Sequence, residues 1–212
     1  MATLKKKNRK ILVGYILINV ILFSLFSNNF IIDTSQISKL LDNPLNPSLI
    51  SVLLLFALSI IIEGVFSSKL KAIIIFHRIK YPLPGCRSFT KIASSDERIN
   101  ISKLKEIYND QLPSESVAQN SEWYKIYQIH KDDEIIQEAH KAFLLTRDLL
   151  AITIILFVLS IIFHLFVGTT STNIIYSCLL YILLIVALKQ AAYNYGNRFT
   201  ADVLVTFVNS KL

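Results

Sequence analysis

Four apolar blocks, separated by polar and charged segments, constrain the fold of this chain more than any other feature. They cover residues 11–26, 49–66, 149–167 and 174–188. A helix that crosses the roughly 30 Å hydrocarbon core of a bilayer needs about 20 mostly apolar residues, because each residue rises about 1.5 Å. The second and third blocks meet this length alone, and the other two are shorter and need flanking residues. The pattern therefore predicts four transmembrane helices.

Composition agrees with a membrane protein. Charged residues make up 17% of the chain and the mean hydropathy is +0.50, whereas soluble domains carry about 25% charged residues. The first block follows a basic run at residues 5–10, as the apolar core of a signal peptide does. No small-residue cleavage site follows it, so we expect an uncleaved helix.

Basic residues are distributed very unevenly between the two sides that the blocks define. The segments 1–10, 67–148 and 189–212 carry 21 of the 22 lysines and arginines, and only Lys39 lies on the other side. The positive-inside rule then places both termini and the long loop in the cytosol, at a bacterial inner membrane. Attraction to anionic headgroups accounts for the net charge of +7 without a nucleic-acid partner.

The expected fold class is an all-α integral membrane protein with a helical cytosolic insert between the second and third transmembrane helices. The chain divides into a basic cytosolic arm, the first two spans with their outer loop, a cytosolic helical domain, a hairpin of the last two spans and a cytosolic C-terminal helix. These parts cover residues 1–10, 11–66, 67–148, 149–190 and 191–212.

Within the insert, residues 69–80 are expected to continue the second helix or to lie along the membrane surface. Short helices are predicted over residues 102–110 and 121–130, from the spacing of their apolar side chains. Asp132 or Asp133 is expected to cap a helix that runs from about residue 133 to 167.

The C-terminal stretch allows two interpretations. Phe199, Val203 and Phe207 share one helical face, while residues 201–207 are rich enough in β-branched side chains for a strand. We favour the helix because these three residues share one face. In either conformation the apolar face must pack on the cytosolic domain, on another subunit or on the membrane surface.

Ionisable residues near the apolar blocks are candidate gating or ion-pair sites. Glu63 interrupts the second block about three residues before its inner end, and an ionisable group inside a span is costly. It either lines a pore or forms an ion pair with Arg147 or Lys189 at matching depth. His164, toward the outer end of the third block, either lines a pathway or forms a hydrogen bond to a neighbouring helix.

The cytosolic insert offers two groups of candidate ligand or partner residues. Trp123, Tyr124 and Tyr127 could stack a ligand, although such aromatic residues also form the core of a small domain. A basic set either binds phosphate groups or contacts lipid headgroups. Its members are Arg78, Lys80, Arg87, Lys91 and Arg98.

Small residues in the last block and beyond it favour close helix packing, within a subunit or between subunits. They stand four positions apart, as Ala187 with Ala191 and Ala192 with Gly196.

The sequence contains no phosphate-binding glycine loop, no zinc-protease motif and no nucleophile elbow, and its His and Cys spacings match no zinc site. We therefore expect neither catalysis nor a metal or other cofactor. Cys86 and Cys178 are not expected to form a disulfide, because one lies in the reducing cytosol and the other inside a span.

Three stretches look like signatures of a family: NSEWYKIY at 120–127, AHKAFLLTRDLL at 139–150 and NYGNRF at 194–199. The layout of four short spans, almost no outer domain and a helical insert that leads into the third span resembles the small membrane subunits of bacterial antiviral defence systems, such as that of the Kiwa system. The resemblance implies a compact bundle with a cytosolic sensing or docking domain, acting in phage defence.

These observations favour a non-enzymatic, homo-oligomeric effector or sensor in the membrane. A ligand or a cytosolic protein partner would bind the insert, and rigid helices would carry that event into the bilayer to open a pore or perturb the membrane. Two alternatives remain: a membrane anchor that docks a cytosolic partner, and a small transporter. The sequence shows neither the broken helices nor the paired intramembrane charges that favour a transporter.

Overall fold

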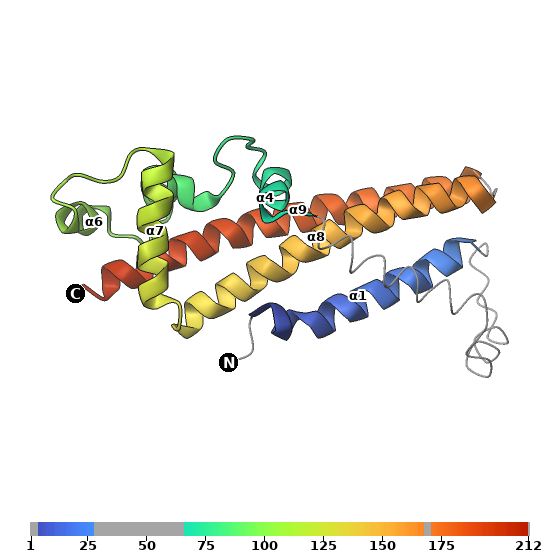
Figure 1. Ribbon diagram of the computed structural model, residues 1–212, viewed down its shortest axis with the longest axis horizontal. Coiled ribbons are helices and arrows are strands. Elements are labelled where there is room, and N and C mark those ends of the chain that lie inside the picture. The colour runs from blue at the N-terminus through green and yellow to red at the C-terminus, as the bar shows by residue number, and fades with distance from the viewer. Residues whose placement is uncertain (1–3, 28–65, 168–170, 212) are drawn as a thin grey trace. The chain divides into compact units, whose positions relative to one another are not determined.

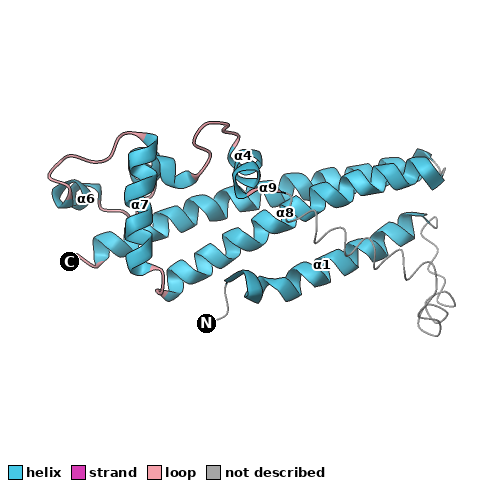
Figure 2. Cartoon of the chain, viewed as in Figure 1, coloured by secondary structure: helices cyan, strands magenta, loops and turns pink. Residues whose placement is uncertain are grey.

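The structure is a computed structural model of the 212-residue chain, and it describes residues 4–27, 66–167 and 171–211. Within these residues it is all-helical, with helices and connecting loops but no strand (Figure 2). The chain forms two compact units. We call them the insert unit, residues 1–7, 67–147 and 189–212, and the apolar unit, residues 8–66 and 148–188.

The insert unit is built from short helices and from the ends of two long ones (Figure 1). Side chains cap its first and third α-helices: Ser67 Oγ accepts a hydrogen bond from Leu70 N at 3.1 Å, and Asn100 Oδ1 accepts one from Lys103 N at 3.0 Å. The short helices are α4 (Ser68–Phe76), the 3₁₀ helix η1 (Pro84–Arg87), the π-helix η2 (Ser88–Ile92), α5 (Ala93–Ser95), α6 (Ile101–Ile107) and α7 (Ser116–His130).

The helix α4 is not an unbroken continuation of the second apolar block. Ser67 has the extended backbone angles φ −59° and ψ 150°, and its hydroxyl caps a new helix. His77 then ends α4 in the left-handed conformation, at φ 52° and ψ 38°. The alternative in which residues 69–80 continue the second span without a break is therefore wrong, because Ser67 is not helical. The other alternative, in which these residues lie along the membrane surface, stays a prediction.

The two predicted insert helices exist with shifted bounds. The first ends at Ile107, before the predicted residue 110, because Asn109 and Asp110 adopt left-handed φ values of 49° and 60°. The second begins at Ser116, five residues before the predicted start at residue 121. Its buried face starts early, because Gln119 already points to the core one turn before Trp123.

The long helix α8 (Glu134–Val167) confirms the predicted helix from the insert through the third apolar block. Asp133 Oδ1 accepts a hydrogen bond from Ile135 N at 3.0 Å, as expected of the capping residue. The helix α9 (Ser171–Asn209) is likewise continuous. The C-terminal stretch is therefore helical as expected, but it is not a separate helix, because no proline interrupts residues 171–209.

Two helices among the described residues are long and apolar enough to cross a membrane: α8 over Glu134–Ile162, and α9. The first apolar block lies in α1 (Leu4–Ser27), which also takes in residues 4–10 of the basic arm. The second block lies outside the described residues except for Phe66.

In the apolar unit, α1 packs against both long helices. Ile16 of α1 lies in one buried cluster with Ile152 and Leu156 of α8 and with Tyr181 of α9. The Oη atom of Tyr15 and Thr153 Oγ1 share a hydrogen bond of 2.7 Å. The first apolar block is thus a packed part of this unit.

Candidate functional site

An aromatic cluster joins α7 to α8 and α9 inside the insert unit. Trp123 is 9% exposed, stacks on Tyr127 with ring centroids 5.7 Å apart, and meets the edge of Phe199 at 5.4 Å. Its indole Nε1 donates a hydrogen bond to the carbonyl oxygen of Thr200 at 3.1 Å. The structure therefore places Trp123 in the core of the insert unit, where one face of the indole ring and its Nε1 atom already contact other residues of the chain.

The neighbouring aromatic residues divide between core and surface. The hydroxyl of Tyr127 lies 3.1 Å from His140 Nδ1, and burial raises the pKa of that phenol. The His140 ring stacks on Phe199 at 4.5 Å. Tyr124, by contrast, is 52% exposed. Of the three aromatic residues singled out in the sequence, Tyr124 is the one whose ring faces solvent.

The small residues of α9 differ in their surroundings. Ala192 and Gly196 are buried, Ala191 is half-buried and Ala187 is exposed. A Cβ atom at Gly196 would lie 2.6 Å from Phe76 Cζ and 2.9 Å from Phe143 Cε2. Gly196 therefore lets α4 and α8 approach α9 inside one insert unit.

A buried carboxylate holds Arg98 against α9. Asp202 is 2% exposed, and its Oδ1 lies 2.7 Å from Arg98 Nη1, while its Oδ2 lies 3.7 Å from Arg198 Nε. Arg98 also bonds Asp96 through Nε and Nη2, at 2.9 and 2.8 Å. The carboxylates of Asp96 and Asp202 raise the pKa of Arg98, so its charge is already compensated by protein.

Replacing Arg98 by alanine is expected to lower the free energy of unfolding of the insert unit by about 1–3 kcal/mol, because Asp202 would remain buried without its close partner. The variant Arg198→Ala removes the 3.7 Å contact of an exposed side chain and should cost less than about 1 kcal/mol. A double-mutant cycle with Asp202→Ala, followed by thermal melts in detergent, measures the coupling. Equal losses from both single variants would contradict this ranking.

A second basic group surrounds a hollow of about 250 Å³, which we call the polar hollow. Three cations, two serines, a threonine and a glutamine contribute to its lining, and none of the described residues that line it carries a carboxylate. The lining residues are Arg78, Tyr81, Cys86, Arg87, Thr90, Lys91, Ser114, Ser116 and Gln119.

Arg87 is the buried member of the polar hollow. It is 8% exposed, its guanidinium carbon lies 5.3 Å from the ring centre of Phe76, and its Nη1 has no hydrogen-bond partner among the described residues. Burial lowers the pKa of Arg87, and the charge of Arg78 lowers it further. Two arginines thus concentrate positive charge at one site.

Gln119 fixes the walls of the polar hollow. Its side-chain Oε1 accepts hydrogen bonds from Phe89 N at 3.1 Å and from both the backbone N and the hydroxyl of Thr90 at 3.2 Å. Its Nε2 donates to the carbonyl oxygen of Ser114 at 2.7 Å. Because both polar atoms of the amide are used, Gln119 acts as a rigid link between η2 and the start of α7.

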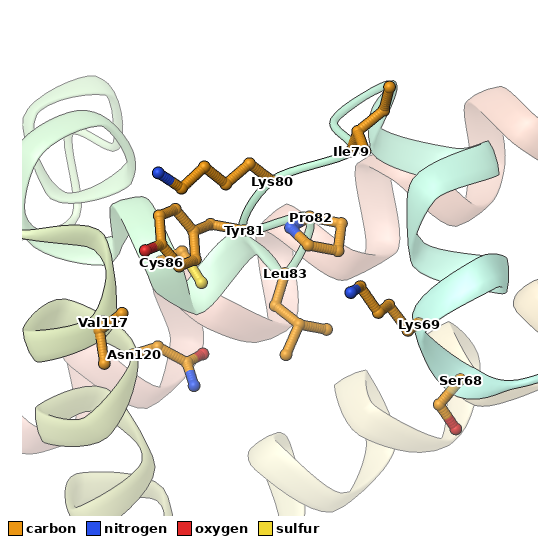
Figure 3. Close-up of a pocket in the computed structure, with 10 residues that line it drawn as sticks. All are labelled: Ser68, Lys69, Ile79, Lys80, Tyr81, Pro82, Leu83, Cys86, Val117 and Asn120. Atoms are coloured by element: carbon orange, nitrogen blue, oxygen red, sulfur yellow. The ribbon is translucent and has the colours of Figure 1, made fainter.

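A larger hollow of about 600 Å³, which we call the apolar hollow, adjoins the polar one, since Tyr81 and Cys86 line both. Figure 3 shows Leu83 between α7, which carries Val117 and Asn120, and α4, which carries Lys69. Burial raises the pKa of the Cys86 thiol, so Cys86 is a weakly reactive neutral group at this boundary.

A third hollow, of about 560 Å³ and here called the mixed hollow, lies beside the Arg98–Asp202 pair. Arg87, Lys91, Arg98 and Arg198 line it, but so do Asp96 and Glu97. Opposite charges therefore balance much of its positive charge.

The structure describes three of the four residues that the sequence suggests as gating or ion-pair sites. His164 is buried in α8, and Arg147 and Lys189 are half-buried where α8 and α9 pass between the two units. Glu63 lies outside the described residues. Among those that are described, no group of three His, Cys, Asp or Glu side chains could hold a metal ion.

Two features of the site escaped the sequence analysis. The role of Asp202 had no local signal, because its partner Arg98 is distant in sequence. Ser114 and Ser116 did have one, since a proline followed by serines is typical of a helix start. Comparison with protein-family models, with curated proteins and with solved structures finds no match.

Proposed function

We propose that the chain is a multi-pass membrane protein of the bacterial inner membrane, with four spans, both termini in the cytosol and the insert unit as its cytosolic part. In this proposal it is a non-enzymatic homo-oligomeric effector or sensor. A ligand or protein partner at the insert unit controls whether the spans form a pore or perturb the bilayer. The resemblance to antiviral membrane subunits makes phage defence the setting we propose.

The continuity of α8 and α9 is the observation that supports this function best. Residues 134–147 and 189–209 of these helices belong to the insert unit, and residues 148–167 and 171–188 belong to the apolar unit. Inside the insert unit, Phe143 of α8 and Phe199 of α9 stack with ring centroids 6.5 Å apart. A shift in this packing would therefore be carried along two unbroken helices into the apolar segments.

Static light scattering of the full chain in detergent is the first test, and we expect a homo-oligomer of about four or more subunits, enough to surround a central pore. In proteoliposomes we then expect Glu63→Gln to change ion flux while leaving the assembly intact, because it removes a charge from the proposed inner mouth. Glu138→Gln, at an exposed site on α8, is the matched control. A monomer, or equal flux from wild type and Glu63→Gln, would contradict the pore.

A membrane anchor that docks a cytosolic protein is the second candidate, and the surface of α7 favours it. Val117 and Tyr124 stand seven residues apart, on one face of the helix, and both are exposed. Exposed apolar groups on one face are typical of protein contact sites. The anchor predicts that Glu63→Gln is silent and that the chain stays monomeric, which separates it from the effector in the same experiments.

A further inference from the structure

We propose that the polar hollow binds a phosphate group, held by Arg78, Arg87 and Lys91 and by the start of α7. In the proposed function, a phosphate group would be the ligand that the sensor recognises, so this proposal rests on that function. Binding to the insert unit can nevertheless be measured separately from ion flux.

Charge is the first argument. The polar hollow is lined by three cations and, within the part of the chain that the structure describes, by no carboxylate. Glu115, which stands between Ser114 and Ser116 in sequence, does not line it. Arg87 is buried with an unpartnered Nη1 beside a second arginine. A buried donor without an acceptor is costly, and a phosphate oxygen would supply both the acceptor and the compensating charge.

The start of α7 is the second argument. The helix is 15 residues long, and its N-cap residue Glu115 makes no side-chain hydrogen bond to the first turn. The backbone N–H groups of a first turn point out of the helix and carry its positive dipole end, which favours an anion. Ser116 from this turn and Ser114 before it line the hollow, so hydroxyl donors stand beside the helix end.

The geometry is pre-organised by Gln119. Its four hydrogen bonds tie Thr90 and Ser114, which both line the hollow, to the first turn of α7. The hollow of about 250 Å³ is smaller than the roughly 300–1,000 Å³ of sites for whole drug-sized ligands. It therefore suits the charged group of a ligand, and the adjoining apolar hollow suits the remainder.

The mixed hollow serves as an internal comparison. Arg98 there is paired with Asp96 and Asp202, and Glu97 adds a further negative charge. An added phosphate would have to compete with these carboxylates. Arg87 and Lys91 line both hollows, but the described residues that line the polar hollow include no carboxylate.

Binding is tested on the full chain in detergent with two sets of probes. One set is soluble: inorganic phosphate, pyrophosphate and adenosine monophosphate, followed by calorimetry at constant ionic strength with chloride as the control anion. The other set is lipid: nanodiscs that contain phosphatidic acid, compared with discs of phosphatidylcholine alone, followed by the thermal midpoint of unfolding. Together they separate a soluble phosphate from a lipid headgroup.

The variant Arg78→Ala/Lys91→Ala removes two exposed cations from the hollow, and Lys105→Ala/Lys131→Ala removes two exposed cations elsewhere. We expect the first variant to lose at least about tenfold in affinity for the probe that binds, or the stabilisation by phosphatidic acid, while the control keeps it. Arg87→Lys, which keeps the charge but not the fork of donors, should weaken binding as well.

Equal binding by wild type and Arg78→Ala/Lys91→Ala, or equal loss in the control variant, would overturn the site. If the variants weaken binding but the probe does not change ion flux, the phosphate site is supported and the sensor function is contradicted. If Glu63→Gln changes ion flux but Arg78→Ala/Lys91→Ala does not change binding, the effector is supported and the phosphate site is contradicted.

Discussion

Replacing Trp123 by alanine is expected to lower the free energy of unfolding of the insert unit by about 3–5 kcal/mol. The substitution removes the stacking on Tyr127, the edge contact with Phe199 and the hydrogen bond to Thr200, all inside the core. Because domains are stable by only about 5–15 kcal/mol, such a loss should unfold much of the unit near physiological temperature. Far-ultraviolet circular dichroism of the full chain in detergent, recorded against temperature, measures it.

Two further variants separate the contribution of the hydrogen bond from that of ring packing, and a core position from an exposed one. Trp123→Phe keeps a ring but leaves the Thr200 carbonyl without its donor, so we expect a loss of about 1–3 kcal/mol. Tyr124→Ala, at the exposed neighbour, should change the unfolding free energy by less than about 0.5 kcal/mol. A Trp123→Ala protein that melts like wild type but no longer binds its ligand would show that the indole is a ligand platform rather than a core residue.

Gly196→Val is expected to destabilise the insert unit by about 3 kcal/mol, at the upper end of the range for overpacked cores. The Cβ atom alone would approach Phe76 Cζ and Phe143 Cε2 to within 3 Å. Both rings are packed, since Phe76 also contacts Tyr193 and Phe143 also contacts Phe199. Neither ring can therefore move away without breaking a second contact.

The measurement uses the fluorescence of the single tryptophan, which lies in the same unit. Gly14→Val, in α1 of the apolar unit, is the control for a valine inside a helix, because a Cβ atom at Gly14 meets nothing within 4 Å. Far-ultraviolet circular dichroism of the full chain follows the melting of both variants. Both variants place the same β-branched residue inside a helix and share its modest effect on helix propensity. If Gly14→Val and Gly196→Val lowered the melting temperature equally, close packing at Gly196 would not be the cause.

The helix α8 could be predicted from sequence because its signals are local, namely the third apolar block and the capping residue Asp133. The helical conformation of α9 could be predicted as well, but its continuity could not, since the sequence favours a span that ends near residue 190 and a separate helix over residues 191–212. The bounds of α6 and α7 could not be predicted. Left-handed residues at positions 109 and 110 follow the end of α6, and neither is a glycine or a proline. The break at Ser67 was also missed, since apolar residues lie on both sides of it.

The candidate site was predictable in its residue types but not in its grouping. Arg78, Arg87 and Lys91 stand in one basic stretch, and the structure keeps them together. Arg98 belongs to the same stretch, yet a carboxylate of α9 draws it into a separate ion pair. That separation depends on a contact between residues 98 and 202, and no local pattern encodes a contact over such a distance in sequence.

The unbroken course of α9 has a consequence for insertions and deletions. One residue added between positions 188 and 189 would turn everything on one side of it by about 100° and shift it by about 1.5 Å. Tyr193, which contacts Phe76 in the insert unit, and Tyr181, which packs in the cluster of the apolar unit, would then change their angular relation along the helix. Length changes in α9 should therefore be tolerated only as whole sets of seven residues, or near them, matched by the same change in α8.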